Sequence, residues 1–292
     1  MNLYFPKAAT LIQLVLLFFV GINAKAQFIP PRADVILIWG MAGDLETEKE
    51  YRDQLHSWLE FLATQKSGGS ITVLADVDLE NVPVKLPVKK LKATREAFLA
   101  LGKTLAASTN KLFVVAWGHG GLQGRTPVFH VRGPRLVPAD FKALAESTKA
   151  PSEWILYFRS SGKFAQELAA PERRIISSEN ETIYASDPVG LSVLLKKLNA
   201  DPSLDFAKGA SEIGLGVASW YRDRNLARTE EPTLWLGSEK PLTLISTESA
   251  AQTNSVPNLK SPLPLTRDLP AAWKEIQSVE AQKFPDADAV VL

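Results

Sequence analysis

Apolar residues along this chain gather into short runs, and most of these runs end at a glycine or at a polar turn. Runs of this length that are rich in β-branched and aromatic residues are typical of strands buried on both faces of a sheet. The pattern predicts six such strands. They span residues 34–40 (DVILIWG), 70–75 (SITVLA), 112–117 (LFVVAW), 153–158 (EWILYF), 173–178 (RRIISS) and 231–237 (EPTLWLG).

The segments between the strands carry apolar residues at helical spacing. Helices are predicted around residues 51–62, 97–105 with Thr94 as cap, 139–146, up to 168, 189–198 and 211–224. Alternation of strands and helices predicts an α/β fold, a mostly parallel six-stranded sheet with helices on both faces in three layers. Residues 76–90 hold prolines and lysines without a period and are predicted to form a solvated loop, and residues 127–131 a small edge strand.

The two ends of the chain differ from this pattern. Residues 1–26 combine Lys7, an apolar stretch and a small-x-small site, which predicts a secretory signal peptide and export to the periplasm or the extracellular space. The apolar stretch is shorter than the ~20 residues of a spanning helix, so no stable membrane anchor is expected. The α/β domain then covers residues 27–245, a polar linker 246–270 and a tail 271–292.

The tail contains the segment FPDADAVVL. This segment resembles the start of a β-rich domain that is found ahead of bacterial transglutaminase-like domains. A chain that stops on an unpaired apolar strand would leave a sticky edge. We therefore expect the sequence to be a truncated product or the front of a longer protein.

Charge and cysteine content exclude several classes of function. The 33 Lys and Arg residues against 32 Asp and Glu residues give a net charge of +1, so nothing favours nucleic acid as a partner. The chain has no cysteine, which removes disulfides, a thiolate nucleophile and cysteine metal ligands. His56 and His130 fall on elements expected to point their side chains to different faces, so neither a metal nor a cofactor is expected.

One predicted strand ends in a motif that suggests chemistry. Gly118-His119-Gly120-Gly121 follows the apolar run at residues 112–117. Open α/β sheets hold their sites at the carboxyl ends of the strands, and glycine lets the backbone approach a ligand closely. His119 is therefore the first candidate for a reacting or binding side chain. A tight turn with a surface histidine is the alternative.

The order of these parts resembles the caspase-like fold that caspases, metacaspases, legumain and clostripain-type cysteine peptidases share. VVAWGHGG is similar to the histidine motif of that family, WILYFRSSGKF stands in the place of its cysteine motif, and RRIISSENETIY in the place of the next strand and loop. The resemblance covers residues 33–237. It implies that His119 is the general base, that the Gly120 N–H lies at the oxyanion position, and that the third and fourth strands are neighbours.

The sequence departs from the family at the nucleophile. Aligning Ser161-Gly162 with the family's Ser-Gly puts Arg159 in the cysteine position, whereas the spacing of caspases puts Ser160 there. Arginine offers no lone pair for attack. A serine hydroxyl needs a base held in position by a third group, and none is evident. Arg159 beside His119 would instead suit an anion or a carboxylate.

The resemblance also implies a substrate groove at the same edge. The loop after the fifth strand would shape its pocket, with Ser177, Ser178, Glu179 and Glu181 as lining and Asp44 as a second acidic wall. Acidic residues there would favour a basic side chain of the ligand. The alternative is that they are ordinary solvated loop acids.

Three functions remain open on these grounds. The first is an exported, catalytically inactive peptidase homologue that binds a peptide or protein. The second is a serine-type peptidase or hydrolase that uses Ser160 and His119. The third is a structural module with no ligand. The ligand and the oligomeric state are not fixed by the sequence.

Overall fold

The computed structural model describes residues 27–65, 68–77, 79, 86–179, 188–237 and 240–244 of the chain. The predicted signal peptide (1–26), linker (246–270) and tail (271–292) lie outside the described residues. None of the helices in the described part is both long and apolar enough to cross a membrane.

The centre of the fold is one sheet in which neighbouring strands follow the order β10-β9-β8-β7-β4-β1-β2-β3. The strands are β1 (Asp34–Trp39), β2 (Ile71–Ala75), β3 (Lys89–Lys92), β4 (Leu112–Trp117), β7 (Ser152–Tyr157), β8 (Arg173–Ser177), β9 (Thr233–Leu236) and β10 (Leu242–Thr243). All pairs from β3 to β8 are parallel, whereas β9 and β10 run antiparallel to their neighbours. The expected α/β class and mostly parallel sheet are confirmed.

The expected number of six strands is wrong, because the sheet has eight. β3 pairs in parallel with β2 inside the stretch that was predicted to be a loop. Its residues, Lys-Lys-Leu-Lys, are mostly exposed, so no apolar run marks an edge strand of this kind. β10 is a two-residue exposed strand at the other edge, which is too short for any periodic signal.

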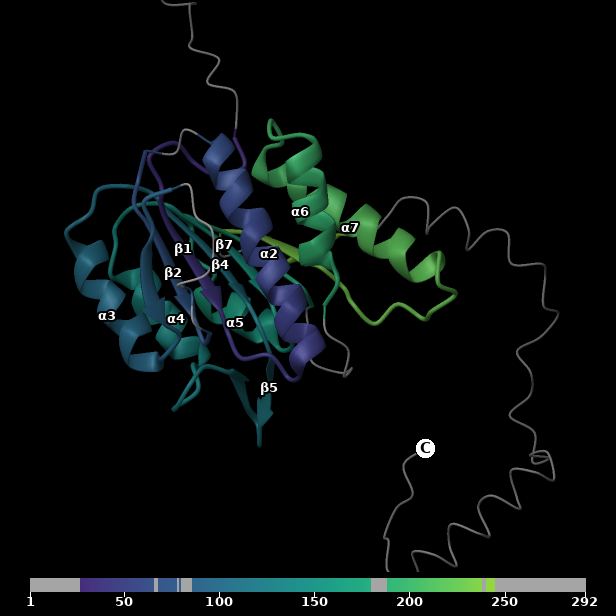
Figure 1. Ribbon diagram of the computed structural model, residues 1–292, viewed down its shortest axis with the longest axis horizontal. Helices are drawn as coiled ribbons and strands as arrows, with labels where there is room; N and C mark the ends of the chain where they lie inside the picture. Colours follow the sequence, from purple (N-terminus) through teal and green to yellow (C-terminus); the bar gives the residue numbers. More distant parts are fainter. Residues whose placement is uncertain are drawn as a thin grey trace, which may run out of the picture. The chain divides into compact units, whose positions relative to one another are not determined.

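Helices cover both faces of the sheet in three layers (Figure 1). Alternate side chains of β1 point to opposite faces of the sheet and pack against different helices. Val35, Leu37 and Trp39 pack in one buried cluster with α2 (Leu45–Thr64), α6 (Gly190–Ala200) and α7 (Phe206–Arg222). Ile36 and Ile38 pack in the other with α3 (Arg95–Ala106), α4 (Pro138–Glu146) and α5 (Ser161–Leu168). The predicted helices are therefore all present in the described part of the chain.

Polar residues fix where two of these helices begin. The Asp44 side chain accepts a hydrogen bond from the Thr47 amide at 2.7 Å and caps α2. The Thr94 hydroxyl accepts from the Ala97 amide at 3.2 Å and caps α3, as predicted. Each cap satisfies an amide that has no partner inside the helix.

A short hairpin leaves the end of β4 and projects beyond the main sheet (Figure 1). It consists of β5 (Gly120–Gln123) and β6 (Thr126–Phe129), which pair antiparallel around Gly124 and Arg125. The predicted edge strand at residues 127–131 is thus the second arm of this hairpin, and it pairs with β5 rather than with the main sheet.

Candidate functional site

The candidate site lies where the parallel strands β4 and β7 end side by side. Their pairing runs from Leu112 opposite Ser152 to Trp117 opposite Tyr157, so the residues that follow each strand come out next to each other. These are the His119 motif after β4 and Arg159-Ser160 after β7. The expected neighbourhood of the third and fourth predicted strands is confirmed, and with it the strand order that the caspase-like resemblance implies.

Two glycines of the His119 motif are required by close backbone contacts. A Cβ atom on Gly120 would lie 2.2 Å from the carbonyl oxygen of Arg159, well inside contact distance. A Cβ atom on Gly118, whose φ is +152°, would lie 2.8 Å from the Cα atom of Gly40. The motif is therefore held between the ends of β1 and β7, and only glycine fits at these two positions.

Ser160 forms the sharp turn that joins β7 to α5. Its φ is +71°, a left-handed conformation that is uncommon for a residue other than glycine. Its hydroxyl donates a hydrogen bond to the carbonyl oxygen of Gly121 at 3.0 Å, and its amide donates to a carboxylate oxygen of Glu179. Ser160 is fully buried. The turn is therefore tied both to the hairpin and to the end of β8.

His119 lies against a second histidine that sequence reasoning did not connect with the site. The ring of His130 is centred 4.9 Å from the ring of His119, and we call the two the imidazole pair. The Arg135 Nε donates to His130 Nδ1 at 3.3 Å. Burial, and then the charges of His119, Arg135 and Arg159, lower the pKa of His130 to about 4. His130 therefore stays neutral near pH 7.

A signal for this contact was present in the sequence. A two-residue turn at Gly124 and Arg125 pairs Gly120 with Phe129 and places His119 opposite His130. The His130 amide donates to the His119 carbonyl oxygen at 2.9 Å in continuation of that ladder. Recognising the hairpin would have brought the two rings together.

Arg159 is half-buried between the imidazole pair and Glu179. Its Nε atom is buried and finds no hydrogen-bond acceptor among the described residues. Burial raises the pKa of Glu179 to about 7, although the Ser160 amide and the charge of Arg159 both act in the opposite direction. Near neutral pH, Glu179 is therefore only partly ionised, and it does not fully balance the charge of Arg159.

A second buried carboxyl group, Glu230, lies behind Glu179. It accepts hydrogen bonds from the amides of Val189 at 2.6 Å and Gly190 at 3.0 Å, where α6 begins. Burial, with a smaller contribution from the charge of Glu179, raises the pKa of Glu230 to about 8, although the two amide hydrogen bonds act in the opposite direction. Burial and then the charge of Glu230 also raise the pKa of Tyr157. Nothing in the sequence around Glu230 marks it as buried.

The other predicted lining residues have structural contacts. The Ser177 hydroxyl bonds the hydroxyl of Thr233 on β9, and Ser178 bonds Ser161 at the start of α5. Both Ser177 and Ser178 are fully buried. Asp44 caps α2 and lines a separate hollow of about 260 Å³ between the ends of β1 and β2. Glu181 lies outside the described residues.

The site thus brings together His119, Gly120, Arg159, Ser160 and Glu179, and it leaves Asp44 apart. What it offers chemically is a guanidinium with one free buried donor beside two imidazoles and Arg135. Such a group binds carboxylates or other anions by charge-assisted hydrogen bonds. Within the described ranges, no group of three or more His, Asp or Glu residues is placed to hold a metal ion.

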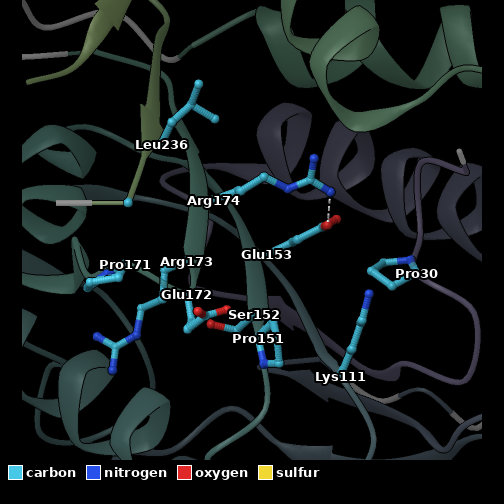
Figure 2. A pocket seen from close by; sticks show the side chains of 11 residues that line it. Pro30, Lys111, Pro151, Ser152, Glu153, Pro171, Glu172, Arg173, Arg174 and Leu236 are labelled. Carbon is cyan, nitrogen blue, oxygen red and sulfur yellow. Dashed lines mark hydrogen bonds and ion pairs between the residues drawn. The ribbon is translucent and has the colours of Figure 1, made fainter. Parts of the chain in front are cut away.

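A further hollow of about 590 Å³ lies at the opposite edge of the sheet, where β4, β7 and β8 begin. Figure 2 shows Arg174 reaching toward Glu153, with which it forms an ion pair, while Lys111 lies near Pro30. Burial raises the pKa of Glu153, and Arg174 opposes that shift. These contacts are far along the strands from His119, and the hollow is not part of the candidate site.

No protein-family model and no curated protein matches the sequence. Solved structures similar to this chain include protein GSU0716 from Geobacter sulfurreducens, at 12% identity and a TM-score of 0.42, over 74% of this chain and 96% of that one. Another is drICE, at 10% identity and a TM-score of 0.43, over 76% of this chain and 97% of that one.

A third similar structure is a secreted C11 cysteine protease from Bacteroides thetaiotaomicron in complex with an irreversible peptide inhibitor. Its identity is 14%, its TM-score is 0.42, and the match covers 69% of this chain. The present chain spans 65% of the length of that protease. The caspase-like arrangement itself follows from the strand order and from the placement of the His119 motif beside Arg159.

Proposed function

We propose that this chain is an exported caspase-like domain that binds a peptide or protein through an acidic group and does not cleave it. The observation that carries the proposal is the position of Arg159. It follows β7 beside the His119 motif, in the place of the family's nucleophile, and its buried Nε donor has no acceptor among the described residues. A buried donor without a partner is costly, and a ligand carboxylate would satisfy it.

The charges around Arg159 favour an acidic ligand over a basic one. Arg135 and the imidazole pair lie on one side; burial first, and then the charges of His119, Arg135 and Arg159, lower the pKa of His130. Glu179 is the acid beside Arg159, but its carboxylate is already bonded to the Ser160 amide and its pKa is about 7. Asp44, the second acid expected in the groove, caps a helix instead. Of the acids expected to favour a basic ligand, Glu179 and Asp44 thus have structural contacts, and Glu181 lies outside the described residues.

Two features argue against cleavage. An arginine side chain stays protonated and cannot attack a carbonyl carbon. The hydroxyl of Ser160 is buried, and it donates a hydrogen bond to the Gly121 carbonyl oxygen. A nucleophile must reach its substrate and pass its proton to a base. In the arrangement described here, Ser160 bonds a carbonyl oxygen instead.

The test uses the purified chain and paired peptide pools in which each position holds either Asp and Glu or Asn and Gln. Binding is measured by fluorescence anisotropy, and cleavage by mass spectrometry of the same samples. We expect the acidic pool to bind more tightly, Arg159→Ala to remove the difference, and no fragments to appear. Arg224→Ala, which changes an exposed arginine just after α7 that stacks on Trp220, is the control. Equal binding of both pools would contradict the proposal.

One observation favours a serine-type hydrolase as the second candidate. Ser160 adopts φ +71° at a strand-to-helix turn, and strained turns of this kind hold nucleophiles in some hydrolases. Under this alternative, the Ser160 hydroxyl would have to leave Gly121 and turn toward His119. Peptide turnover that disappears in both Ser160→Ala and His119→Ala would establish it. If the chain is a structural module without a ligand, it should bind and cleave no peptide, and Arg159→Ala, Ser160→Ala and His119→Ala should change neither measurement.

Export is tested separately from ligand binding. The signal at residues 1–26 places the cleavage site before Gln27. When the full sequence is expressed in a bacterium, we expect the periplasmic or secreted product to begin at Gln27, as read by mass spectrometry. Retention of the uncleaved chain in the cytoplasm would overturn this part of the proposal.

A further inference from the structure

A groove runs beside the candidate site between the β5–β6 hairpin and the helices α4 and α5. Its volume is about 730 Å³. Leu122 of β5, Val137 and Pro138 at the start of α4, and Lys163 of α5 are among the residues that line it. Leu122 is 52% exposed. Lys163, which lines the groove, follows Ser160 by three residues, so one end of the groove lies close in the chain to the candidate site.

Along this groove β5 is exposed or half-exposed from Gly121 to Gln123, whereas Gly120 is buried. Within the part of the chain that the structure describes, β5 pairs only with β6. Leu122 lies opposite Pro127, which has no N–H, and Gly120 lies opposite Phe129, whose amide donates to Leu136 at 2.8 Å. These are therefore the pairs that exchange no hydrogen bonds, and the backbone groups of Gly120 and Leu122 point away from β6. An extended peptide can pair with such an edge.

Spacing along the strand sets where the side chains of a paired peptide would fall. Gly120 is packed against the backbone of Arg159, and Leu122 lies two residues further along. Two residues of strand advance by roughly 6.6 Å and return to the same face of the pleat. A peptide residue near Gly120 would therefore meet Arg159, and the residue two positions away would lie over Leu122 and the groove.

The charges of the groove agree with an acidic peptide. Arg125 and Lys163 line it, and the backbone of Arg159 packs against Gly120 at the start of β5. Its lining acid, Glu167, faces Lys142 at 3.9 Å on the neighbouring helix α4. The strip from Arg159 to Arg125 thus carries a surplus of positive charge beside an exposed leucine. It complements a chain with an acidic residue and an apolar residue on the same face.

We infer that the outer edge of β5 binds an extended segment of a partner protein in which an acidic residue and an apolar residue stand two positions apart. The acidic residue binds Arg159, and the apolar residue covers Leu122 in the groove. This inference rests on the proposed function, and it adds the strand pairing and the apolar subsite.

The probe is a blocked, fluorescein-labelled heptapeptide, Thr-Thr-Asp-Thr-Leu-Thr-Thr, with two relatives in which Asp becomes Asn or Leu becomes Ser. Leu122→Asp should weaken binding of the parent peptide by about tenfold, because it removes apolar contact and adds a repelling charge. Leu226→Asp is the matched control, since Leu226 is also 52% exposed but lies away from the groove. The Leu-to-Ser peptide should bind weakly to both variants. Equal binding of the parent peptide to both variants would overturn the apolar subsite.

Backbone pairing is tested with N-methyl groups on the peptide. One peptide carries them on Asp and Leu, and the other on the two Thr residues that follow these positions. Alternate amides of a paired strand point toward the neighbouring strand, so one peptide should lose binding and the other should keep it. If both keep it, strand pairing is wrong.

These outcomes separate the inference from the proposed function. A loss of binding with Arg159→Ala but not with Leu122→Asp leaves carboxylate binding in place and rejects the groove. Equal binding of the Asp and Asn peptides rejects carboxylate binding, whatever Leu122→Asp does.

Discussion

The side chain of Glu179 accepts a hydrogen bond from the backbone amide of Ser160 and so ties the end of β8 to the turn after β7. The turn carries a left-handed residue, and it places Arg159 next to His119. Both groups of this hydrogen bond are buried, so neither has water as a substitute partner. The position of Arg159 therefore depends on a residue that comes from a different strand.

Loss of this hydrogen bond should destabilise the domain. Glu179→Ala leaves the Ser160 amide buried without an acceptor, which should lower the free energy of unfolding by about 1–3 kcal/mol. Glu179→Gln keeps an oxygen acceptor and should cost less. Urea unfolding followed by circular dichroism measures both, and equal stabilities of the two variants would show that the bond contributes nothing.

Buried carboxyl groups should make the domain less stable as the pH rises. The folded-state pKa values of Glu230 and Glu179 are raised to about 8 and about 7 from an ordinary value of 4.5, so the folded chain binds more protons than the unfolded chain between these limits. The free energy of unfolding then falls as the pH rises through that window. We expect the thermal midpoint to decrease between about pH 5 and about pH 8.

Glu230→Gln tests how much Glu230 contributes to the decrease of the thermal midpoint with rising pH, which we call the pH slope. The amide side chain cannot ionise, so the thermal midpoint should depend less on pH over the same window. Glu231→Gln changes the neighbouring, exposed glutamate and should keep the slope of the unaltered protein. An unchanged slope in Glu230→Gln would mean that this carboxyl group ionises as freely in the folded state as in the unfolded state.

The two adjacent glycines of the hairpin offer a matched pair. A Cβ atom on Gly120 would strike the Arg159 backbone, whereas a Cβ atom on Gly121 would meet nothing within 4 Å. Gly120→Ala should lower the free energy of unfolding by about 1–3 kcal/mol and weaken peptide binding, because Arg159 must move. Gly121→Ala should leave both nearly unchanged. Thermal unfolding measures the stability of the two variants, and fluorescence anisotropy measures their peptide binding. Equal results for both variants would contradict the prediction.

The imidazole pair reports the field of the neighbouring arginines. Arg135 and Arg159 both lower the pKa of His130, so Arg135→Ala and Arg159→Ala should each raise that pKa toward its ordinary value of 6.5. NMR titration of the ring protons measures the change. Arg224→Ala, at an exposed distant position, should leave the titration where it is. If the pKa of His130 is the same in Arg159→Ala as in the unaltered protein, the Arg159 guanidinium does not lie near the imidazole pair.

Sequence reasoning captured the parts of this fold that leave a periodic or apolar signal. β1, β4 and β7 are continuous buried runs, and their parallel order placed His119 beside Arg159. It missed β3 and β10, because exposed edge strands need no apolar run. An apolar periodicity in the sequence indicates buried side chains. It gives no signal for a strand that is held in the sheet by backbone hydrogen bonds alone.

The polar interior of the site was harder to predict. Ser177 and Ser178 were expected to line a pocket, and nothing local marks Glu230 as buried, yet each is buried and bonded to a partner distant along the chain. Such pairs depend on three-dimensional neighbours, and no local pattern carries them. Glu179 was placed correctly at the edge, but as an exposed wall of a pocket rather than as the buried support of a turn.

Three lysines on β3, Lys89, Lys90 and Lys92, affect whether a second molecule can add a strand to this edge of the sheet. β3 forms one rim of the sheet, and its side chains are exposed. A second molecule that docked there rim to rim would bring ammonium groups against ammonium groups, and like charges would drive it away. The three lysines therefore disfavour edge-to-edge pairing of a second strand with β3.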